Sequence, residues 1–318
     1  MLLGIDIGGT KVVLAVGDAE GRTQASRRRS MSLSGDWRAD LDALAEEARG
    51  VLQDAGVAPS ELRQIGVSVP GPADPAAGVL LNPPNLPGWE NVPVAAHLEE
   101  SLGAPTRIEN DANAAALAEA RFGAGQGASD LVYLTMSTGV GGGVLSGGQL
   151  VRGAFGAAGE PGHIPIVANG RPCACGLRGC LEAYVGGNAW RDHLRSLAPM
   201  DSDAVVRAGG DPTALKPEHV VAAAQGGDPW AREMFGVWLD DLAQGIATIV
   251  MLVEPKRIVL GTIAVAAGEA LCFAPLRERL RTRLWPQQAE RLEVVPAGLG
   301  DALPERAGFA VALEADPR

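Results

Sequence analysis

Residues 2–16 read LLGIDIGGTKVVLAV and join two apolar runs through an acid, two glycines, a hydroxyl and an amine. The runs Leu2–Ile7 and Val12–Val16 have the length and apolar content of buried strands, and the glycines between them predict a tight turn. The sequence therefore opens on a strand–turn–strand unit whose polar groups, Asp6, Thr10 and Lys11, lie in the turn or next to it.

This turn is suited to hold a phosphate group. Gly8 and Gly9 let backbone N–H groups approach a phosphate, and Thr10 and Lys11 can donate hydrogen bonds to it. Asp6 is suited to hold a magnesium ion through water. The pattern is neither a P-loop nor a dinucleotide-binding fingerprint, because a strand rather than a helix follows the glycines. Taken alone, it is explained almost as well by a plain Gly-Gly hairpin.

A second unit of the same build follows later in the chain. The segment STGVGGG, residues 137–143, connects the predicted strands Leu131–Thr135 and Val140–Leu145 and places Thr138 and Gly139 in the turn. Two strand–turn–strand units indicate a duplicated fold with two lobes, and we expect a nucleotide to lie in a cleft between them.

Hydropathy patterning predicts an α/β protein, because strands cluster early and then alternate with helices. Its 318 residues allow two domains or one large one. The predicted helices are Trp37–Ala55, Ala95–Leu102, Ala112–Arg121, Pro229–Val253, Ala266–Leu284 and Leu303–Glu314. The other predicted strands are one ending at Ser30, Ile65–Val69, Thr106–Glu109, Arg257–Leu260 and Leu292–Pro296.

Composition narrows the functional class. Acidic residues outnumber basic ones by 38 to 27, a net charge of −11, which disfavours binding to nucleic acid. The chain begins on an apolar strand rather than a secretory leader, and the most apolar run, Ile246–Val253, is far shorter than the roughly 20 residues of a membrane span. We therefore expect a cytoplasmic protein without membrane contacts.

The segment Glu109-Asn110-Asp111-Ala112-Asn113 ends a strand and opens an alanine-rich helix. Asp111 is explained most simply as the N-cap of that helix. A carboxylate at the carboxyl end of a strand can also take a proton from a substrate hydroxyl as a general base. The spacing alone leaves both interpretations open.

The cysteines give the most specific local pattern. Cys173, Cys175 and Cys180 follow His163 closely, and three thiolates with one imidazole make the ligand set of a closed, structural zinc site. Glu160 and Glu182 flank this cluster, and carboxylates bind sugar hydroxyls well because they only accept hydrogen bonds.

Together these motifs resemble the ROK family (repressors, open reading frames, kinases), and within it the ATP-dependent bacterial glucokinases. They occur in the family's order over nearly the whole chain, and the Cys-x-Cys-Gly-x-x-Gly-Cys run is the most specific of them. The matching segments are Asp6–Lys11, Pro70–Pro72, Pro84-Asn85, Glu109–Asn113, Thr138–Gly143, Glu160–His163 and Cys173–Glu182.

The resemblance implies a two-domain, actin-like (ribonuclease H-like) sugar kinase fold. Residues 1–110 plus about 303–318 would form the small domain, and residues 111–302 the large one with a zinc loop at 163–180. It also implies a homodimer or tetramer. The first phosphate turn begins at residue 6, so we expect no N-terminal helix-turn-helix of the kind that family repressors carry.

The resemblance also implies roles for individual residues. Asp111 would be the general base that takes the proton from the 6-hydroxyl of a hexose, most simply glucose. His163 would bind zinc through one ring nitrogen and a sugar hydroxyl through the other. The implied sugar contacts are Asn85, Asn110, Asp111, Glu160, His163 and Glu182. The implied ATP and Mg²⁺ residues are Asp6, Gly8, Gly9, Thr10, Lys11, Thr138, Gly139 and Gly261.

One departure from the family's pattern affects the donor site. Family kinases usually place several glycines after the late strand, whereas here only Gly261 matches and the β-branched Thr262 and Ile263 follow. A shifted loop with ordinary ATP use is the expected outcome, with weakened ATP binding or another donor such as polyphosphate as alternatives. Other hexoses, N-acetylhexosamines and a sugar-sensing protein without catalysis also remain open.

Overall fold

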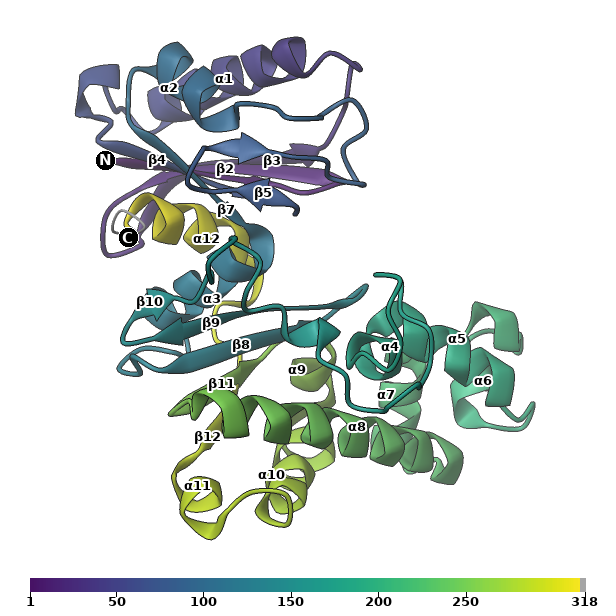
Figure 1. Ribbon diagram of the computed structural model, residues 1–318. Helices are drawn as coiled ribbons and strands as arrows, with labels where there is room; N and C mark the ends of the chain where they lie inside the picture. Colours follow the sequence, from purple (N-terminus) through teal and green to yellow (C-terminus); the bar gives the residue numbers. More distant parts are fainter. Residues whose placement is uncertain (315–318) are drawn as a thin grey trace. The chain divides into compact units, whose positions relative to one another are not determined.

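The computed structural model describes residues 1–314, which form two compact units (Figure 1). The first comprises Met1–Gln126, Ala154–Gly156 and the chain from Gly298 onward, and the second comprises Gly127–Gly153 and Ala157–Ala297. By their contacts, residues 111–126 and 298–302 lie in the first unit, whereas the sequence analysis placed them in the large domain. Residues 315–318, which it assigned to the small domain, lie outside the described residues.

The sheet of the first unit has the strand order β3-β2-β1-β4-β7. The expected hairpin is present, because β1 pairs antiparallel with β2 and β2 with β3, while β4 and β7 run parallel to β1. Parallel strands end at the same edge of a sheet, so the residues that follow β1, β4 and β7 come together there. The strands are β1 (Leu2–Ile7), β2 (Lys11–Gly17), β3 (Thr23–Ser30), β4 (Gln64–Val69) and β7 (Thr106–Asn110).

Helices cover both faces of this sheet (Figure 1). Helices α1 (Trp37–Asp54) and α2 (Val94–Leu102) pack on one face, and α3 (Asp111–Phe122) and α12 (Leu303–Ala312) on the other. Helix α12 approaches the backbone of β1 and β4 closely. A Cβ atom on Gly66 would lie 2.1 Å from the carbonyl oxygen of Gly308, so a glycine is required there. The short hairpin of β5 (Ala73–Asp74) and β6 (Val79–Leu80) lies between β4 and α2.

The second unit repeats the pattern of an antiparallel hairpin followed by parallel strands. Its sheet has the order β10-β9-β8-β11-β12, with β8 antiparallel to β9 and parallel to β11. This repetition confirms the α/β prediction. The strands are β8 (Leu131–Met136), β9 (Val140–Ser146), β10 (Gln149–Leu150), β11 (Arg257–Leu260) and β12 (Glu293–Pro296).

Most of the helices belong to the second unit, and the longest, α8, lies in its core. Phe235, Trp238 and Leu242 on α8 are fully or almost fully buried. By length and composition, α8 alone among the helices of residues 1–314 is a candidate membrane span, yet half of its most apolar window is buried. The helices are α4 (Glu182–Val185), α5 (Gly187–Leu197), α6 (Asp203–Arg207), α7 (Pro217–Gly226), α8 (Pro229–Val253), α9 (Ile263–Gly268), α10 (Ala274–Arg281) and α11 (Pro286–Arg291).

The prediction of one continuous helix over Ala266–Leu284 is wrong, because the structure has two helices with a π-helical turn between them. Helix α9 ends at Gly268, a π-helical turn spans Glu269–Phe273, and α10 follows. Gly268 has a φ of 75°, which no residue adopts inside an α-helix. The apolar spacing persists through the break, which is why the sequence pattern alone indicated one helix.

Candidate active site

In the first unit, the carboxyl ends of β1, β4 and β7 bring polar groups together. Asp6 is in register with Ser68 on β4, and Ser68 with Glu109 on β7. The Ser68 hydroxyl donates a hydrogen bond of 2.6 Å to Oδ1 of Asp6. The sequence analysis missed Ser68, because a single serine in an apolar strand has no distinguishing pattern until the strands are paired.

The carboxyl group of Asp6 is partly withdrawn from water. Burial raises its pKa to about 6, the hydrogen bond from Ser68 opposes this shift, and the negative charge of Asp111 adds to it. Two carboxylates therefore influence each other at this edge of the sheet. A bound cation would relieve such an arrangement.

Asp111 is the first residue of α3, and its environment differs from that of an ordinary N-cap. The cap is Asn110, whose side-chain oxygen accepts the N–H groups of Ala112 (2.9 Å) and Asn113 (3.4 Å). The simple N-cap interpretation of Asp111 is therefore wrong. Its carboxylate accepts one bond from the N–H of Ala112, yet burial by surrounding protein raises its pKa above the ordinary value. A raised pKa suits a general base.

The glycine turn after β1 is closed by its own backbone. The N–H of Gly8 donates to the carbonyl of Lys11 at 2.8 Å, and the turn leaves Gly9, Thr10 and Lys11 exposed. A Cβ atom on Gly9 would lie 3.0 Å from Cβ of Asn85. The structure thus places Asn85, an expected sugar contact, directly against the expected phosphate turn.

Replacing Asp6 with asparagine is expected to stabilise the protein at neutral pH and not in acid. The carboxyl of Asp6 has a pKa of 3.8 as its ordinary value and about 6 in the folded state. The folded state therefore becomes less stable relative to the unfolded state as the pH rises through this range, because the buried carboxyl must then ionise. Asparagine keeps the acceptor for Ser68 without the charge. We expect the thermal unfolding midpoint to rise at pH 7.5 by about 2–4 °C, the shift for roughly 1 kcal/mol. An equal gain at pH 4 would contradict a buried charge as the cause.

In the second unit, the turn after β8 is held by two neighbours. The N–H groups of Gly187 and Asn188, at the start of α5, donate to the carbonyls of Ser137 (2.8 Å) and Thr138 (2.9 Å). Oε2 of Glu182 accepts the N–H of Val140 at 2.9 Å, and a Cβ on Gly139 would collide with that same oxygen. Glycine is therefore required at 139 for Glu182 to reach the turn.

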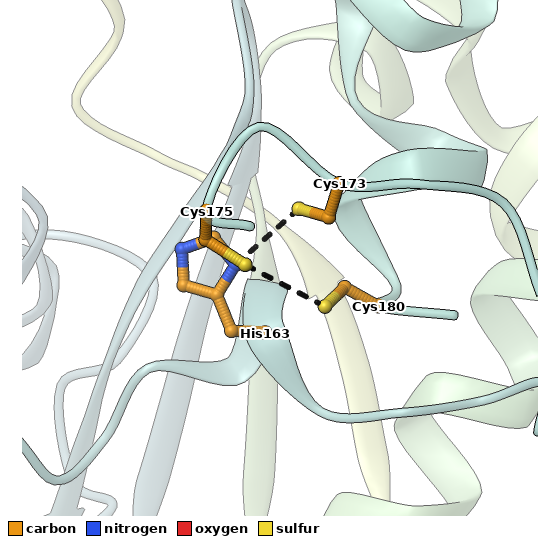
Figure 2. A group of neighbouring side chains, drawn as sticks. All are labelled: His163, Cys173, Cys175 and Cys180. Carbon is orange, nitrogen blue, oxygen red and sulfur yellow. Dashed lines mark hydrogen bonds between the residues drawn. The ribbon is translucent and has the colours of Figure 1, made fainter. Parts of the chain in front are cut away.

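His163, Cys173, Cys175 and Cys180 converge as the sequence predicts (Figure 2). Their ligand atoms all lie within 4.8 Å of one another. Nδ1 of His163 is 3.8 Å from Sγ of Cys173, and the Sγ atoms of Cys175 and Cys180 are also 3.8 Å apart. Tetrahedral zinc with Zn–S bonds of about 2.3 Å places its sulfur ligands about 3.8 Å apart. The donor set and its spacing fit zinc.

Glu182 joins this cluster to the glycine turn. Its Oε1 lies 3.5 Å from Sγ of Cys173, while its Oε2 holds Val140. A second anchor is Tyr184, whose hydroxyl accepts the backbone N–H of Arg171 at 2.9 Å. The cysteine loop and the turn after β8 are therefore one connected structure within this unit.

The turn that carries His163 is fixed against β9. Glu160 precedes the 3-10 turn Pro161–His163, and its carbonyl accepts the N–H of His163 at 3.1 Å. A Cβ on Gly162 would lie 2.1 Å from the carbonyl oxygen of Val140. Close backbone packing at Gly162 thus sets where His163 points, and the Glu160 side chain lies exposed beside it.

A cavity of about 380 Å³ lies beside the second turn. Its lining includes three basic side chains that were not predicted from the sequence, because two of them lie on α5 and the third lies just before α7. The lining residues are Met136, Ser137, Thr138, Gly187, Asn188, Arg191, Arg195, Lys216, Pro217, Glu218, Thr262 and Ile263. Gly261 is buried immediately before this lining segment.

Thr262 adopts a backbone conformation that favours glycine. Its φ is 45° and its ψ −108°, which is unusual for a β-branched residue. The side-chain hydroxyl donates to the carbonyl of Met136 at 2.6 Å, and it lies 3.4 Å from the Thr135 hydroxyl. The loop therefore keeps a glycine-like backbone, and the hydroxyl bond offsets part of the strain.

The family model described as "ROK family" matches residues 2–314. The chain belongs to the ROK family. Its fold is the two-domain actin-like fold of ROK sugar kinases, as the sequence predicts. The ROK hexokinase of Thermus thermophilus has 36% sequence identity and a TM-score of 0.82, covering 98% of each chain.

Two further similar proteins are informative. A glucokinase from Thermotoga maritima is 34% identical over 94% of this chain and 92% of its own length. The structure of a ROK family glucokinase from Streptomyces griseus, in complex with glucose and AMPPNP, has 31% identity and a TM-score of 0.77, with 98% and 97% of the two chains covered.

Proposed function

We propose that this ROK protein is an ATP-dependent glucokinase, a phosphotransferase that moves the γ-phosphoryl group of ATP to the 6-hydroxyl of glucose. The observation that carries the proposal is Asp111, whose carboxylate is open to solvent at the start of α3 while the surrounding protein raises its pKa. Membership of the ROK family and the likeness to glucokinases support it.

Asp111 would accept the proton of the sugar 6-hydroxyl as that oxygen attacks phosphorus. Phosphoryl transfer depends mainly on positioning and on neutralising charge, so the acceptor oxygen must be held in line with the leaving oxygen. Asn110 caps α3 and thereby fixes the carboxylate beside it. The proposed sugar contacts are Asn85, Asn110, Asp111, Glu160, His163 and Glu182.

The two glycine turns would serve the nucleotide. Exposed backbone N–H groups and the side chains of Thr10 and Lys11 suit phosphate oxygens. Mg²⁺, held by Asp6 through water, would neutralise charge on the transferring phosphoryl group. The 380 Å³ cavity beside Thr262 suits the remainder of the nucleotide. The residues proposed for ATP and Mg²⁺ are Asp6, Gly8, Gly9, Thr10, Lys11, Thr138, Gly139 and Gly261.

Zinc at His163, Cys173, Cys175 and Cys180 would be structural, since four protein ligands leave no position for a reactive water. In this role it would fix the loop that holds Glu182 and the turn that holds His163. We also propose that the protein is cytoplasmic, because the cytoplasm is a reducing compartment in which a cluster of cysteines stays free. We further propose that it is a homo-oligomer, a dimer or tetramer.

The test is a panel of hexoses and N-acetylhexosamines, assayed for ADP release with Mg·ATP and, in parallel, for sugar phosphate formation with inorganic polyphosphate. We expect glucose with ATP to give the highest kcat/KM. A higher value for another sugar would replace glucose as the substrate. Absence of turnover with every sugar, together with sugar binding but no nucleotide binding in calorimetry, would favour a sugar sensor and overturn the kinase.

Replacing Thr262 with glycine tests the donor site. The substitution removes a side chain that lines the cavity and relieves a strained φ, while it loses the bond to Met136. We expect the KM for ATP to fall by about tenfold, the low end of the roughly 10–200-fold that one methyl-sized group in a pocket is worth, with the KM for glucose unchanged. Steady-state kinetics measure both, and an unchanged KM for ATP would place the nucleotide elsewhere.

A further inference from the structure

Glu119 on α3 is fully buried, and its carboxylate binds only backbone. Its two oxygens accept the N–H of Ala124 (2.8 Å), of Gly298 (3.0 and 3.1 Å) and of Leu299 (3.0 Å). No ion pair within residues 1–314 includes Glu119. Burying an unpaired carboxylate is costly unless hydrogen bonds compensate, so this arrangement needs all of its donors.

The donors lie within the first unit, on the two segments where the chain leaves that unit and returns to it, which we call the connecting segments. Apart from residues 154–156, the chain leaves the first unit after Gln126 and returns to it at Gly298. Ala124 therefore lies just before the chain leaves the first unit, and Gly298 and Leu299 are the first residues after the chain returns to it. A single side chain binds both connecting segments, although Ala124 and Gly298 are 174 positions apart in the sequence.

The surrounding backbone is shaped to allow this contact. A Cβ on Gly123 would lie 2.1 Å from Oε2 of Glu119, and a Cβ on Gly298 would lie 3.0 Å from the backbone nitrogen of Ala124. The backbone carbonyl of Glu119 also accepts the N–H of Gly125 at 2.9 Å. Glycines thus let both connecting segments come close to the carboxylate.

The same helix carries the proposed base. Asp111 is the first residue of α3, and Glu119 follows eight residues later, about two turns along the helix. We infer that Glu119 is a positioning residue for phosphoryl transfer, which fixes both connecting segments to the helix that bears Asp111. This inference rests on the proposed kinase function. It requires that the two connections move with α3 rather than independently of it.

Glu119→Gln is the direct test, because the amide keeps the size of the side chain but turns one acceptor into a donor that faces backbone N–H groups. We expect kcat for glucose phosphorylation to fall by about tenfold or more, since small misplacements of reacting groups cost this much, with the KM for glucose changed less than about threefold. Hydrogen exchange at the amides of Ala124, Gly298 and Leu299 is expected to accelerate by about tenfold.

Leu117→Ala is the matched control. Leu117 lies on the same helix and makes none of these hydrogen bonds. It packs against a small apolar cluster of α3 and α12, formed by Ala114, Ala118, Ala307, Ala310 and Val311. Both variants are compared at temperatures equally far below their unfolding midpoints. If the kcat of Glu119→Gln equals the kcat of Leu117→Ala under these conditions, Glu119 is merely structural and the inference is overturned. Unchanged exchange at the three amides would overturn it as well, and this readout does not depend on activity of the wild-type protein.

Discussion

The Asp111→Asn variant will turn over glucose about 10²- to 10⁴-fold more slowly than the wild-type protein, which is the contribution of a well-placed general base. Asparagine preserves the size of the side chain and can still accept the N–H of Ala112, so α3 should begin as before. It cannot accept the proton of the sugar hydroxyl. A coupled assay of ADP release measures the loss of kcat.

Affinity for the sugar distinguishes a lost base from a lost binding site. Because Asp111→Asn removes an interaction made mainly in the transition state, we expect calorimetry to give a glucose Kd close to that of the wild type. Asp36→Asn is the matched control. Asp36 is the N-cap of α1, and its side chain accepts the N–H of Arg38, so it is a carboxylate at the start of a helix without the proposed chemistry. Full activity in Asp111→Asn would remove this residue from the base role.

Replacing Cys175 with serine will release zinc and lower kcat/KM for glucose about 100-fold. A structural ion holds its loop together, so losing one of four ligands loosens the whole cysteine loop. Glu182 contacts both Cys173 and Val140, and the disorder is therefore expected to reach the turn at Thr138 and Gly139. Metal analysis should give one zinc per wild-type chain and less than one in the variant.

The fourth cysteine supplies the control. Cys272 is completely buried in the core of the second unit, away from the cluster. Cys272→Ala should lower stability by leaving a small cavity, but it should keep one zinc per chain and the wild-type kcat/KM at moderate temperature. Full activity of a zinc-free Cys175→Ser protein would show that the loop keeps its structure without the ion.

Most of the strands and helices followed from the sequence because each depends on local periodicity. The apolar runs of β1, β2 and β8 and the long helix α8 appear where the pattern predicts them. Helix α9 was mistaken for part of a longer helix, since periodicity does not register a single glycine with a positive φ. The convergence of His163 with the three cysteines was predictable for a different reason, because zinc chemistry strongly restricts which spacings of ligands are useful.

Other features became visible only when the strands and helices were assembled. Ser68 bonds Asp6 because β1 and β4 are in register, and Asn110 rather than Asp111 caps α3. The raised pKa of Asp6 depends on how much protein surrounds it. The three basic side chains around the cavity come from helix α5 and the segment before α7.

By itself, the sequence determined the α/β class, the two glycine turns, the cluster of His163 with three cysteines, and the family, because each depends on residue spacing over short stretches of the chain. Only the tertiary structure decided which side chains meet. It gave Thr262 a glycine-like backbone and placed Glu119 against both connecting segments. It also brought Glu182 into contact with both the cysteine loop and the glycine turn after β8. The physical reason is that hydrogen bonds and burial act over a few ångströms of space, whatever the separation along the chain.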